Sequence, residues 1–187
     1  MKPPKELEHP IHALLEKRWS PRSFDQKKLT HEQVSSLFEA GKWSASAFNE
    51  QPWRFLYALK QDGDAYDKLF LGLNEKNRVW AESAPMVGFV IAKTRFTRND
   101  KPNQHAWYDT GMAMSQLTLQ ATDMNLYVHQ MAGIERDYLT EEYSIKAPFE
   151  IICGFVVGYF GSPEHLDGSL AEMEKSVQQR KKLSEII

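Results

Sequence analysis

Two short segments of this chain carry residue types that could bind a small molecule. The first, residues 18–24, reads Arg-Trp-Ser-Pro-Arg-Ser-Phe and holds two guanidinium groups and two hydroxyls. Guanidinium forks match phosphate oxygens in a bidentate manner, and serine hydroxyls can donate to the oxygens that remain. Pro21 holds the backbone extended between the polar side chains. The segment therefore predicts an anion clamp, although two isolated arginines would more often cap a helix or form surface ion pairs.

The second segment, residues 49–55, reads Asn-Glu-Gln-Pro-Trp-Arg-Phe. It places the two neutral amides of Asn49 and Gln51 directly before an apolar stretch. A planar heteroaromatic ring with alternating donors and acceptors needs such groups along its edge. A phosphate site together with a site for a polar-edged ring is what flavin mononucleotide (FMN) requires, so this cofactor is the prediction.

Local patterns place these segments among helices and strands. Residues 30–33, Thr-His-Glu-Gln, match a capping box and predict a helix that ends near residues 43–46. A strand is expected at residues 53–59, because a proline can begin a strand but not continue it. The unbroken apolar run 86–92 predicts a central strand buried on both faces. Residues 74–77 are polar and charged and are expected to form a loop.

The longest predicted helix covers residues 105–124, with apolar or small residues nearly all round it. Such a helix is buried, either in the core or in a subunit interface. Before it, residues 93–104 are polar and basic without periodicity, which predicts a loop. Its basic residues are usually just solvated, although beside a flavin they could also contact the phosphate of NADPH.

Bulk composition fits one globular domain and excludes several function classes. The chain has 187 residues, 42% apolar and 26% charged, with a formal net charge of -2. Without a basic excess, neither nucleic acid nor an anionic membrane is an expected partner. Cys153 is the only cysteine, so no intrachain disulfide can form. No metal site is predicted, no apolar stretch has the length of a membrane span, and a cytoplasmic location is the expectation.

Three segments, in this order, resemble the FMN-dependent nitroreductase family. They are the Arg-x-Ser-x-Arg-x-Phe opening, the Asn-x-Gln-Pro-Trp-x-Phe segment and the basic C-terminus Arg-Lys-Lys at residues 180–182. The resemblance runs from about residue 11 to the last residue. It implies FMN as cofactor, with NAD(P)H as a transient hydride donor. The residues expected to bind FMN are Arg18, Trp19, Ser20, Arg22, Asn49, Gln51, Ala132, Gly133, Arg180 and Lys182.

The resemblance also implies a role for each part of this set. Arg18, Ser20, Arg180 and Lys182 would hold the phosphate. Arg22 would lie near the N1/O2 edge of the ring, where a cation favours the anionic reduced flavin. Asn49 would bind the pyrimidine edge, with Gln51 as the weaker candidate. Ala132 or Gly133 would donate a backbone N–H to flavin N5, although from the residues alone an ordinary strand-to-helix turn is equally consistent.

The activity implied is an FMN-dependent NAD(P)H oxidoreductase that reduces nitroaromatic, quinone or related acceptors by ping-pong hydride transfer through flavin N5. No side chain is assigned a catalytic role, because a flavin supplies the hydride chemistry itself. Two alternatives stay open. One is another flavin reaction on the same fold, such as reductive dehalogenation or a dehydrogenation, and the other is a low-turnover flavin carrier or sensor.

The expected architecture is α+β. Helices alternating with about four apolar strands predict this class or mixed α/β. The resemblance implies a central mixed, mainly antiparallel sheet flanked by helices in three layers, in a single domain of residues 1–187. It further implies an obligate homodimer with FMN sites at the interface. Residues 1–9 are expected to be flexible, and residues 176–187 to reach across the dimer. One departure is Asn125, which stands where the family often has a glycine.

Overall fold

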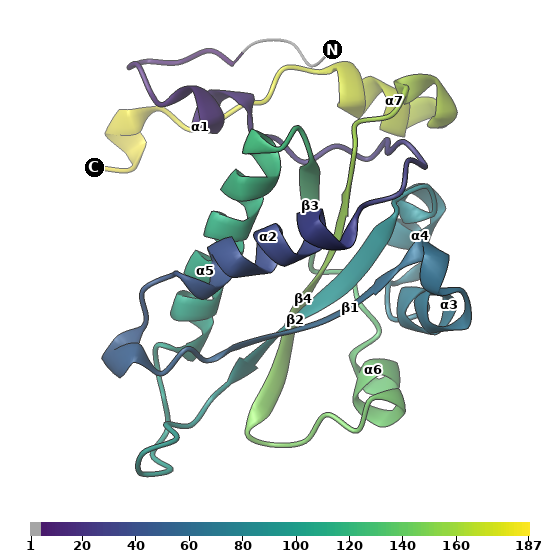
Figure 1. The fold of residues 1–187 in the computed structure, drawn as a ribbon. Coiled ribbons are helices and arrows are strands. Elements are labelled where there is room, and N and C mark those ends of the chain that lie inside the picture. The colour runs from purple at the N-terminus through teal and green to yellow at the C-terminus, as the bar shows by residue number, and fades with distance from the viewer. Residues whose placement is uncertain (1–4) are drawn as a thin grey trace.

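A four-stranded antiparallel sheet forms the centre of the molecule. The computed structural model describes residues 5–187, apart from the side chain of His165. The strands are β1 (Trp53–Leu59), β2 (Met86–Lys93), β3 (Tyr127–Met131) and β4 (Phe149–Gly158). They lie in the order β1-β2-β4-β3, and every neighbouring pair is antiparallel (Figure 1). This confirms the α+β class, the strand predicted at residues 53–59 and the central position of the apolar run 86–92.

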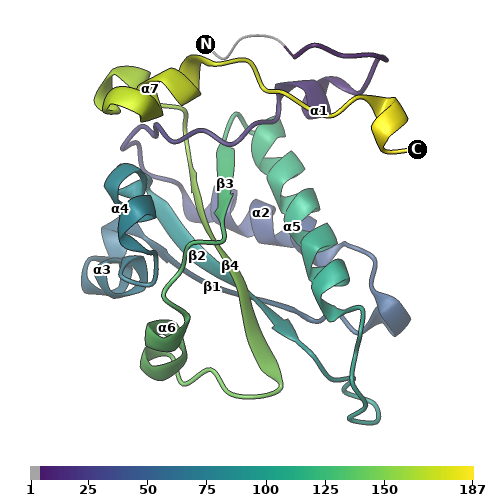
Figure 2. The same cartoon turned by 180° about the vertical axis from the view of Figure 1, so that it is seen from behind.

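Helices cover both faces of this sheet (Figures 1 and 2). On one face lie α2 (His31–Lys42) and α5 (Ala106–Asp123). On the other lie α3 (Asp64–Phe70), α4 (Glu75–Ala81) and α6 (Arg136–Glu142). The short α1 (Ala13–Lys17) and α7 (Gly168–Lys175) lie at one end of the sheet, together with both terminal segments. Four 3-10 turns complete the described elements: η1 (Ala47–Asn49), η2 (Lys60–Asp62), η3 (Pro163–His165) and η4 (Leu183–Glu185).

Strand β2 shows why two helical layers are needed. Its alternate side chains enter two separate cores, since successive residues of a strand point to opposite faces. Val87, Phe89 and Ile91 pack with the residues of α3, α4 and α6. Met86 and Val90 pack with those of α2 and α5. The strand is therefore buried on both faces, as its unbroken apolar sequence predicts.

Two helix starts test the local sequence signals. The capping box before α2 forms as predicted, because the Thr30 hydroxyl accepts from Gln33 N–H and the Gln33 side chain accepts from Thr30 N–H. The loop predicted at residues 74–77 is wrong. Asn74 Oδ1 accepts from Asn77 N–H at 3.1 Å and acts as the N-cap of α4. An asparagine N-cap is a common helix signal, and here the charged residues after it occupy the exposed first turn.

Helix α5 buries only one of its sides within a single chain. Ala113, Met114, Leu117 and Ala121 are buried, whereas Tyr108 keeps 67% of its surface exposed. The burial of its other side in a subunit interface stays a prediction. Two residues after the end of the helix, Asn125 has a φ of 57°. Asparagine tolerates this left-handed conformation better than most residues, so it fills the position that a glycine would otherwise take.

No helix within residues 5–187 is long and apolar enough to cross a membrane.

Candidate functional site

The segment of residues 18–25, here called the strap, is fixed by residues far away in the sequence. The side chain of Glu174, only 2% exposed, accepts from Arg22 N–H at 2.9 Å and from Ser23 N–H at 3.2 Å. The Ser23 hydroxyl donates to the Ser162 carbonyl at 2.5 Å. Buried backbone donors are costly when left without an acceptor. The path of the strap therefore depends on α7 and on the segment after β4.

His129 of β3 fixes the strap from the other side. Burial lowers the pKa of His129 to about 4, with the Arg22 charge acting in the same direction and hydrogen bonds to the backbone of Pro21 and Ser20 opposing it. The imidazole is therefore neutral at pH 7. Its Nδ1 lies 2.7 Å from the Pro21 carbonyl oxygen. A carbonyl only accepts, so Nδ1 must carry the proton and donate it.

Three cations gather around the start of the strap: Lys5, Arg18 and Arg180. Burial, and then the charge of Arg180, lower the pKa of the Arg18 guanidinium. Burial, and then the charges of Arg18 and Arg180, lower the pKa of Lys5. Lys5 Nζ donates to the carbonyls of Leu15 and Arg18, at 2.6 Å each. The structure thus brings Arg18 and Arg180 together across the length of the chain.

One carboxylate acts on this cation cluster (Lys5, Arg18 and Arg180) without forming an ion pair, because the charge of Glu16 opposes the lowering of the Lys5 pKa. Among residues 5–187, none of the three forms an ion pair with an Asp or Glu. Arg18 Nη1 donates to the Ser20 hydroxyl at 3.4 Å. Lys5 and Arg18 are half-buried and Arg180 is exposed. Like charges held close together favour a bound anion, which relieves their repulsion.

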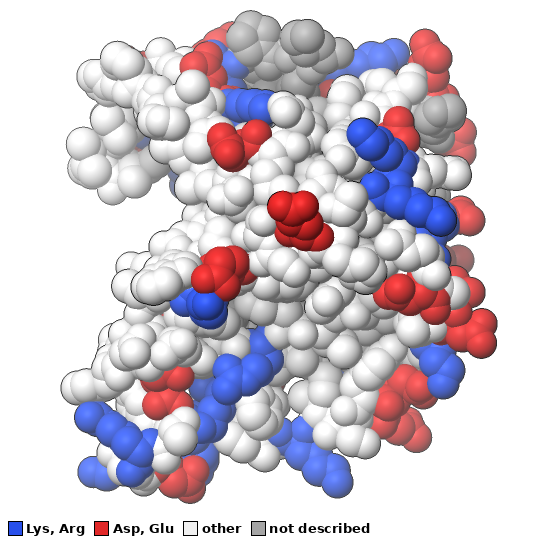
Figure 3. Space-filling model, in the orientation of Figure 1, with Lys and Arg blue, Asp and Glu red and all other residues white. Residues whose placement is uncertain are grey.

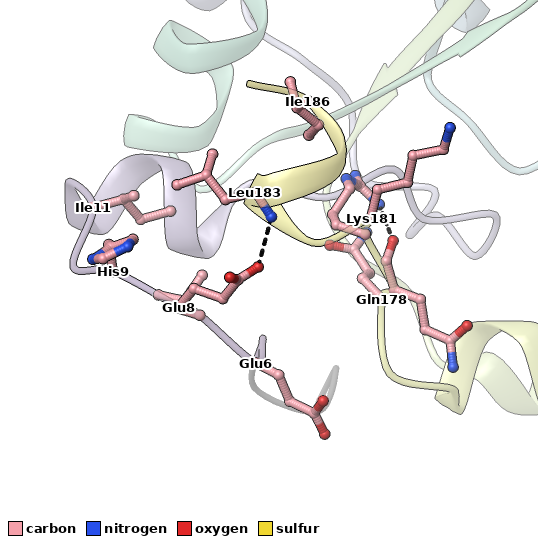
Figure 4. Close-up of a pocket in the computed structure, with 11 residues that line it drawn as sticks. Glu6, Glu8, His9, Ile11, Gln178, Lys181, Leu183 and Ile186 are labelled. Atoms are coloured by element: carbon pink, nitrogen blue, oxygen red, sulfur yellow. Dashed lines mark hydrogen bonds between the residues drawn. The ribbon is translucent and has the colours of Figure 1, made fainter.

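The C-terminal segment passes beside this cluster. Leu183 N–H donates to Glu8 Oε1 at 2.9 Å and closes one side of a cavity of about 480 Å³ (Figure 4). Its lining comes from residues 6–11 and 178–186 and includes Arg180. Lys182 is exposed, and its backbone N–H donates to Glu185 Oε1. The predicted crossing of residues 176–187 to a partner stays a prediction. Of the stretch 1–9, residues 1–4 lie outside the described residues.

Trp19 and Arg22 differ in what they offer to a ligand. The Trp19 ring is buried and meets Tyr127 and Phe160 edge-on, with ring centroids 6.0 and 5.2 Å away. Its side chain therefore anchors the strap in the core. Arg22 is half-buried, with its Cζ 5.9 Å from the centroid of the Trp80 ring.

The turn after β3 is shaped by two asparagines of α4. The Gly133 carbonyl accepts from Asn74 N–H at 3.2 Å and from Asn77 Nδ2 at 2.9 Å. A Cβ on Gly133 would lie 2.5 Å from Asn74 Nδ2 and 2.7 Å from Asn77 Nδ2. A side chain at this position would therefore have to displace the side chains of the two asparagines. Ala132 next to it is exposed.

Asn49 and Gln51 lie on an exposed and strained segment. Phe48, Asn49 and Gln51 have φ values of 54°, 54° and 51°, in the left-handed region. For Phe48 and Gln51 this conformation costs about 1 kcal/mol or more each and persists only where the surroundings impose it, whereas asparagine tolerates it better. Here Ala47 N–H donates to the buried Asp109 of α5 at 2.9 Å. Strain of this kind concentrates at ligand-binding sites.

Helix α5 keeps the two halves of the predicted site apart. At its C-terminal end, Lys17 Nζ donates to Asn125 Oδ1 at 2.6 Å, just before the strap begins. At its N-terminal end, Asp109 holds the segment of Asn49. An 18-residue helix is about 27 Å long. One chain therefore does not bring Asn49 and Gln51 to the cation cluster (Figure 1).

Comparison with known proteins identifies the family. The sequence model described as "Nitroreductase family" matches residues 15–159, which is most of the chain. The chain belongs to this family. It is 30% identical over 97 residues to the major NAD(P)H-flavin oxidoreductase of Aliivibrio fischeri, a match that covers 50% of this chain and 44% of that relative. The chain thus matches less than half of that relative's length.

Solved structures agree with this assignment. A crystal structure described as an oxidoreductase containing FMN superposes with a TM-score of 0.92 and 32% identity, over 98% of this chain and 93% of the other. A nitroreductase family protein from Clostridium difficile gives a TM-score of 0.70 at 25% identity, over 93% and 94% of the two chains. The fold of the whole described chain is therefore that of the nitroreductase family.

Three residues that organise the strap were not predicted from the sequence. Lys5 lies in a polar lead, Glu174 in a charged helix, and His129 in a short strand. Each resembles its solvated or packed neighbours in sequence. A contact more than 100 residues away, such as that of Glu174 with Arg22, has no local signal. The half-buried alternation of β3 is the one pattern that could have placed His129 against another segment.

Glu50 links the strained segment to the loop of residues 93–104. Its Oε1 accepts from Thr97 N–H at 2.8 Å and from the Thr97 hydroxyl at 2.5 Å, and it lies 3.5 Å from Lys93 Nζ. The side chain is 7% exposed. Burial alone would raise the pKa of Glu50, but the hydrogen bonds from Thr97 and the nearby Lys93 outweigh it and hold the pKa below its usual value.

We expect this link to make stability depend on pH. A carboxyl whose pKa is lowered by folding stabilises the protein above its unfolded pKa, about 4.3, and loses this effect as the pH falls through the lower folded value. Glu50→Gln should therefore lower the thermal unfolding midpoint at pH 6–7, and the gap from the wild type should shrink below about pH 4. The exposed Glu141→Gln removes the same charge and is the control. Parallel pH profiles for both variants would contradict the link.

Proposed function

We propose that this chain is an FMN-dependent NAD(P)H oxidoreductase that reduces nitroaromatic, quinone or related acceptors. The observation that carries the proposal is the cation cluster, no member of which forms an ion pair with a carboxylate of the described residues. Family membership and the names of the two relatives, a flavin oxidoreductase and an FMN-containing oxidoreductase, support the choice of cofactor. FMN, when bound, supplies the hydride chemistry, so the chain needs to bind and orient it.

The residues present fit a phosphate at the strap. Arg18 and Arg180 would hold it as a charged fork, with Lys5 adding a further charge and the Ser20 hydroxyl a donor. Glu174 and His129 would act by fixing the backbone on which Arg18 and Ser20 stand. Lys182 is exposed near the same end of the chain and is the weakest member of this set.

The remaining residues fit the ring of FMN. Asn49 and Gln51 are exposed and offer amide donors and acceptors to its pyrimidine edge. Arg22 offers a cation to the N1/O2 edge. The exposed Ala132, or Gly133 next to it, offers a backbone N–H to flavin N5. Because α5 separates Asn49 from Arg18, we propose that a second copy of the chain supplies the ring-binding segment. The site would then lie at a homodimer interface, with residues 176–187 reaching across it.

The proposed activity predicts a yellow protein whose bound flavin is alternately reduced and reoxidised. Under anaerobic conditions, the flavin absorbance should bleach on addition of NADPH or NADH and return on addition of a nitroaromatic or quinone. A colourless protein that cannot be loaded with FMN would overturn the proposal. A flavin that NAD(P)H does not reduce would favour the carrier, or a flavin enzyme with a different donor.

Replacing Arg18 should weaken retention of FMN. Arg18→Ala removes a charged hydrogen-bonding partner of the phosphate, which corresponds to a loss of affinity of about tenfold to a hundredfold. The measurement is the dissociation constant of FMN by fluorescence titration of the apoprotein. Lys28→Ala, at an exposed position outside the cluster, removes the same charge and should bind FMN like the wild type. Equal affinity of both variants would count against the phosphate assignment.

Mixed dimers test which chain supplies which contact. Arg18→Ala and Asn49→Ala should each bind FMN weakly as homodimers, because every site carries one defect. If Arg18 of one chain and Asn49 of the other meet at one site, a mixed dimer carries both defects in one site and none in the other. Purified mixed dimers, obtained with two affinity tags, should therefore bind one FMN with wild-type affinity. A mixed dimer without a restored site would contradict a site shared between chains.

A further inference from the structure

An exposed group of two aromatic rings and one cation lies beside Asn49. Phe48 keeps 72% of its surface exposed, and its ring meets that of Phe96 edge-on, with centroids 5.7 Å apart. Arg98 Cζ lies 3.8 Å from the centroid of the Phe48 ring and 5.4 Å from that of Phe96. We call these three residues the Phe48–Phe96–Arg98 cluster.

The protein holds this cluster in place at a cost. Phe48 combines an exposed aromatic ring with a left-handed backbone, φ 54° and ψ 25°. For a bulky residue this conformation is an outlier. It persists because Asp109 anchors the turn before Phe48 and Glu50 ties the turn to Thr97, between Phe96 and Arg98. Glu50 thus joins the turn that holds Phe48 to the loop that holds Phe96 and Arg98.

Arg98 differs from the other arginine of its loop. Arg95 Nη1 donates to the Asp100 carbonyl and lies 3.3 Å from its carboxylate, so its charge is used within the loop. The Arg98 guanidinium makes no hydrogen bond or ion pair with any residue from 5 to 187, and it lies over the two rings. A guanidinium stacked on a ring keeps its in-plane N–H donors free for an anion.

The surroundings of the cluster are basic but not uniformly so. Figure 3 shows several Lys and Arg side chains, with carboxylates among them, at the end of the molecule where the loop lies in Figure 1. Lys93 and Asp100 are already engaged by Glu50 and Arg95. Arg98 is the cation of this loop that lies over the two rings and is left to offer its charge to a ligand there.

We propose that the Phe48–Phe96–Arg98 cluster is a subsite for a flat aromatic ring that carries an anionic group. The rings contact the face of the ligand, and the in-plane donors of Arg98 bind its anion. This rests on the proposed function, because the ligand reaches a flavin only if Asn49 and Gln51 bind the ring of FMN. Two sources share this chemistry: an acidic aromatic acceptor such as a nitrobenzoate, and the adenosine 2′-phosphate part of NADPH.

Matched ligand pairs test the subsite without turnover. Dissociation constants are measured by ligand-observed NMR for 4-nitrobenzoate against 4-nitrobenzamide, and for 2′,5′-ADP against 5′-AMP. Arg98→Gln should weaken binding of the more anionic member of one pair by about fivefold, with less than a twofold change in the other member. An effect on 4-nitrobenzoate identifies the acceptor as the ligand, and an effect on 2′,5′-ADP identifies NADPH.

Two controls separate the subsite from simpler explanations. Lys101→Gln removes the same charge from the same loop and should change each constant by less than twofold. Phe48→Leu should weaken both members of the affected pair equally, because it removes the stacking ring and keeps the charge. The proposal is overturned if Arg98→Gln changes no constant, weakens all four ligands equally, or acts no more strongly than Lys101→Gln. The proposed function is tested separately, by the FMN content of the wild-type protein and by the bleaching of its flavin with NAD(P)H.

Discussion

The repulsion among Lys5, Arg18 and Arg180 is the constraint on which the rest of this end of the molecule depends. Lys5 and Arg18 are half-buried and Arg180 is exposed, and none of these three cations from opposite ends of the chain forms an ion pair with a carboxylate of the described residues. Such an arrangement is unfavourable unless other contacts impose it. Glu174 and His129 impose it through the backbone of the strap, and Trp19 does so by its burial against Tyr127 and Phe160.

The sheet and α5 set a second constraint, which is distance. Both cores are built on the two faces of β2, so the helices must lie along the sheet and α5 must run past most of it. The strap therefore meets one end of α5 and the segment of Asn49 the other. Within one chain, the strap and the segment of Asn49 therefore do not contact each other. A ligand that needs both must be bound between two chains.

Local patterns predicted the parts of this structure that local physics decides. The capping box at Thr30, the doubly buried strand 86–92 and the gathering of Arg18 with Ser20 depend on residues close in sequence. The prediction that Arg180 lies near Arg18 came from the order of motifs along the chain rather than from their spacing.

The features that were predicted wrongly or were missed depend on contacts between residues far apart in the sequence. Glu174 is one of two acidic residues in α7, and only the fold shows that it accepts from the strap. A loop was predicted at residues 74–77 because these residues are polar and charged. Asn74 is instead the N-cap of α4, which begins at the next residue.

The two ends of the proposed site are prepared by opposite means, and this has a consequence for specificity. At the strap the preparation is electrostatic and partly buried, as a phosphate of fixed charge requires. At Phe48, Asn49 and Gln51 it is backbone strain on exposed residues, held by Asp109 and Glu50. Changes at sites far apart with no shared partners act nearly independently. Because about 27 Å of helix separates the two ends in one chain, substitutions around Phe48, Phe96 and Arg98 can alter which ligand binds beside the ring without disturbing the phosphate site of that chain.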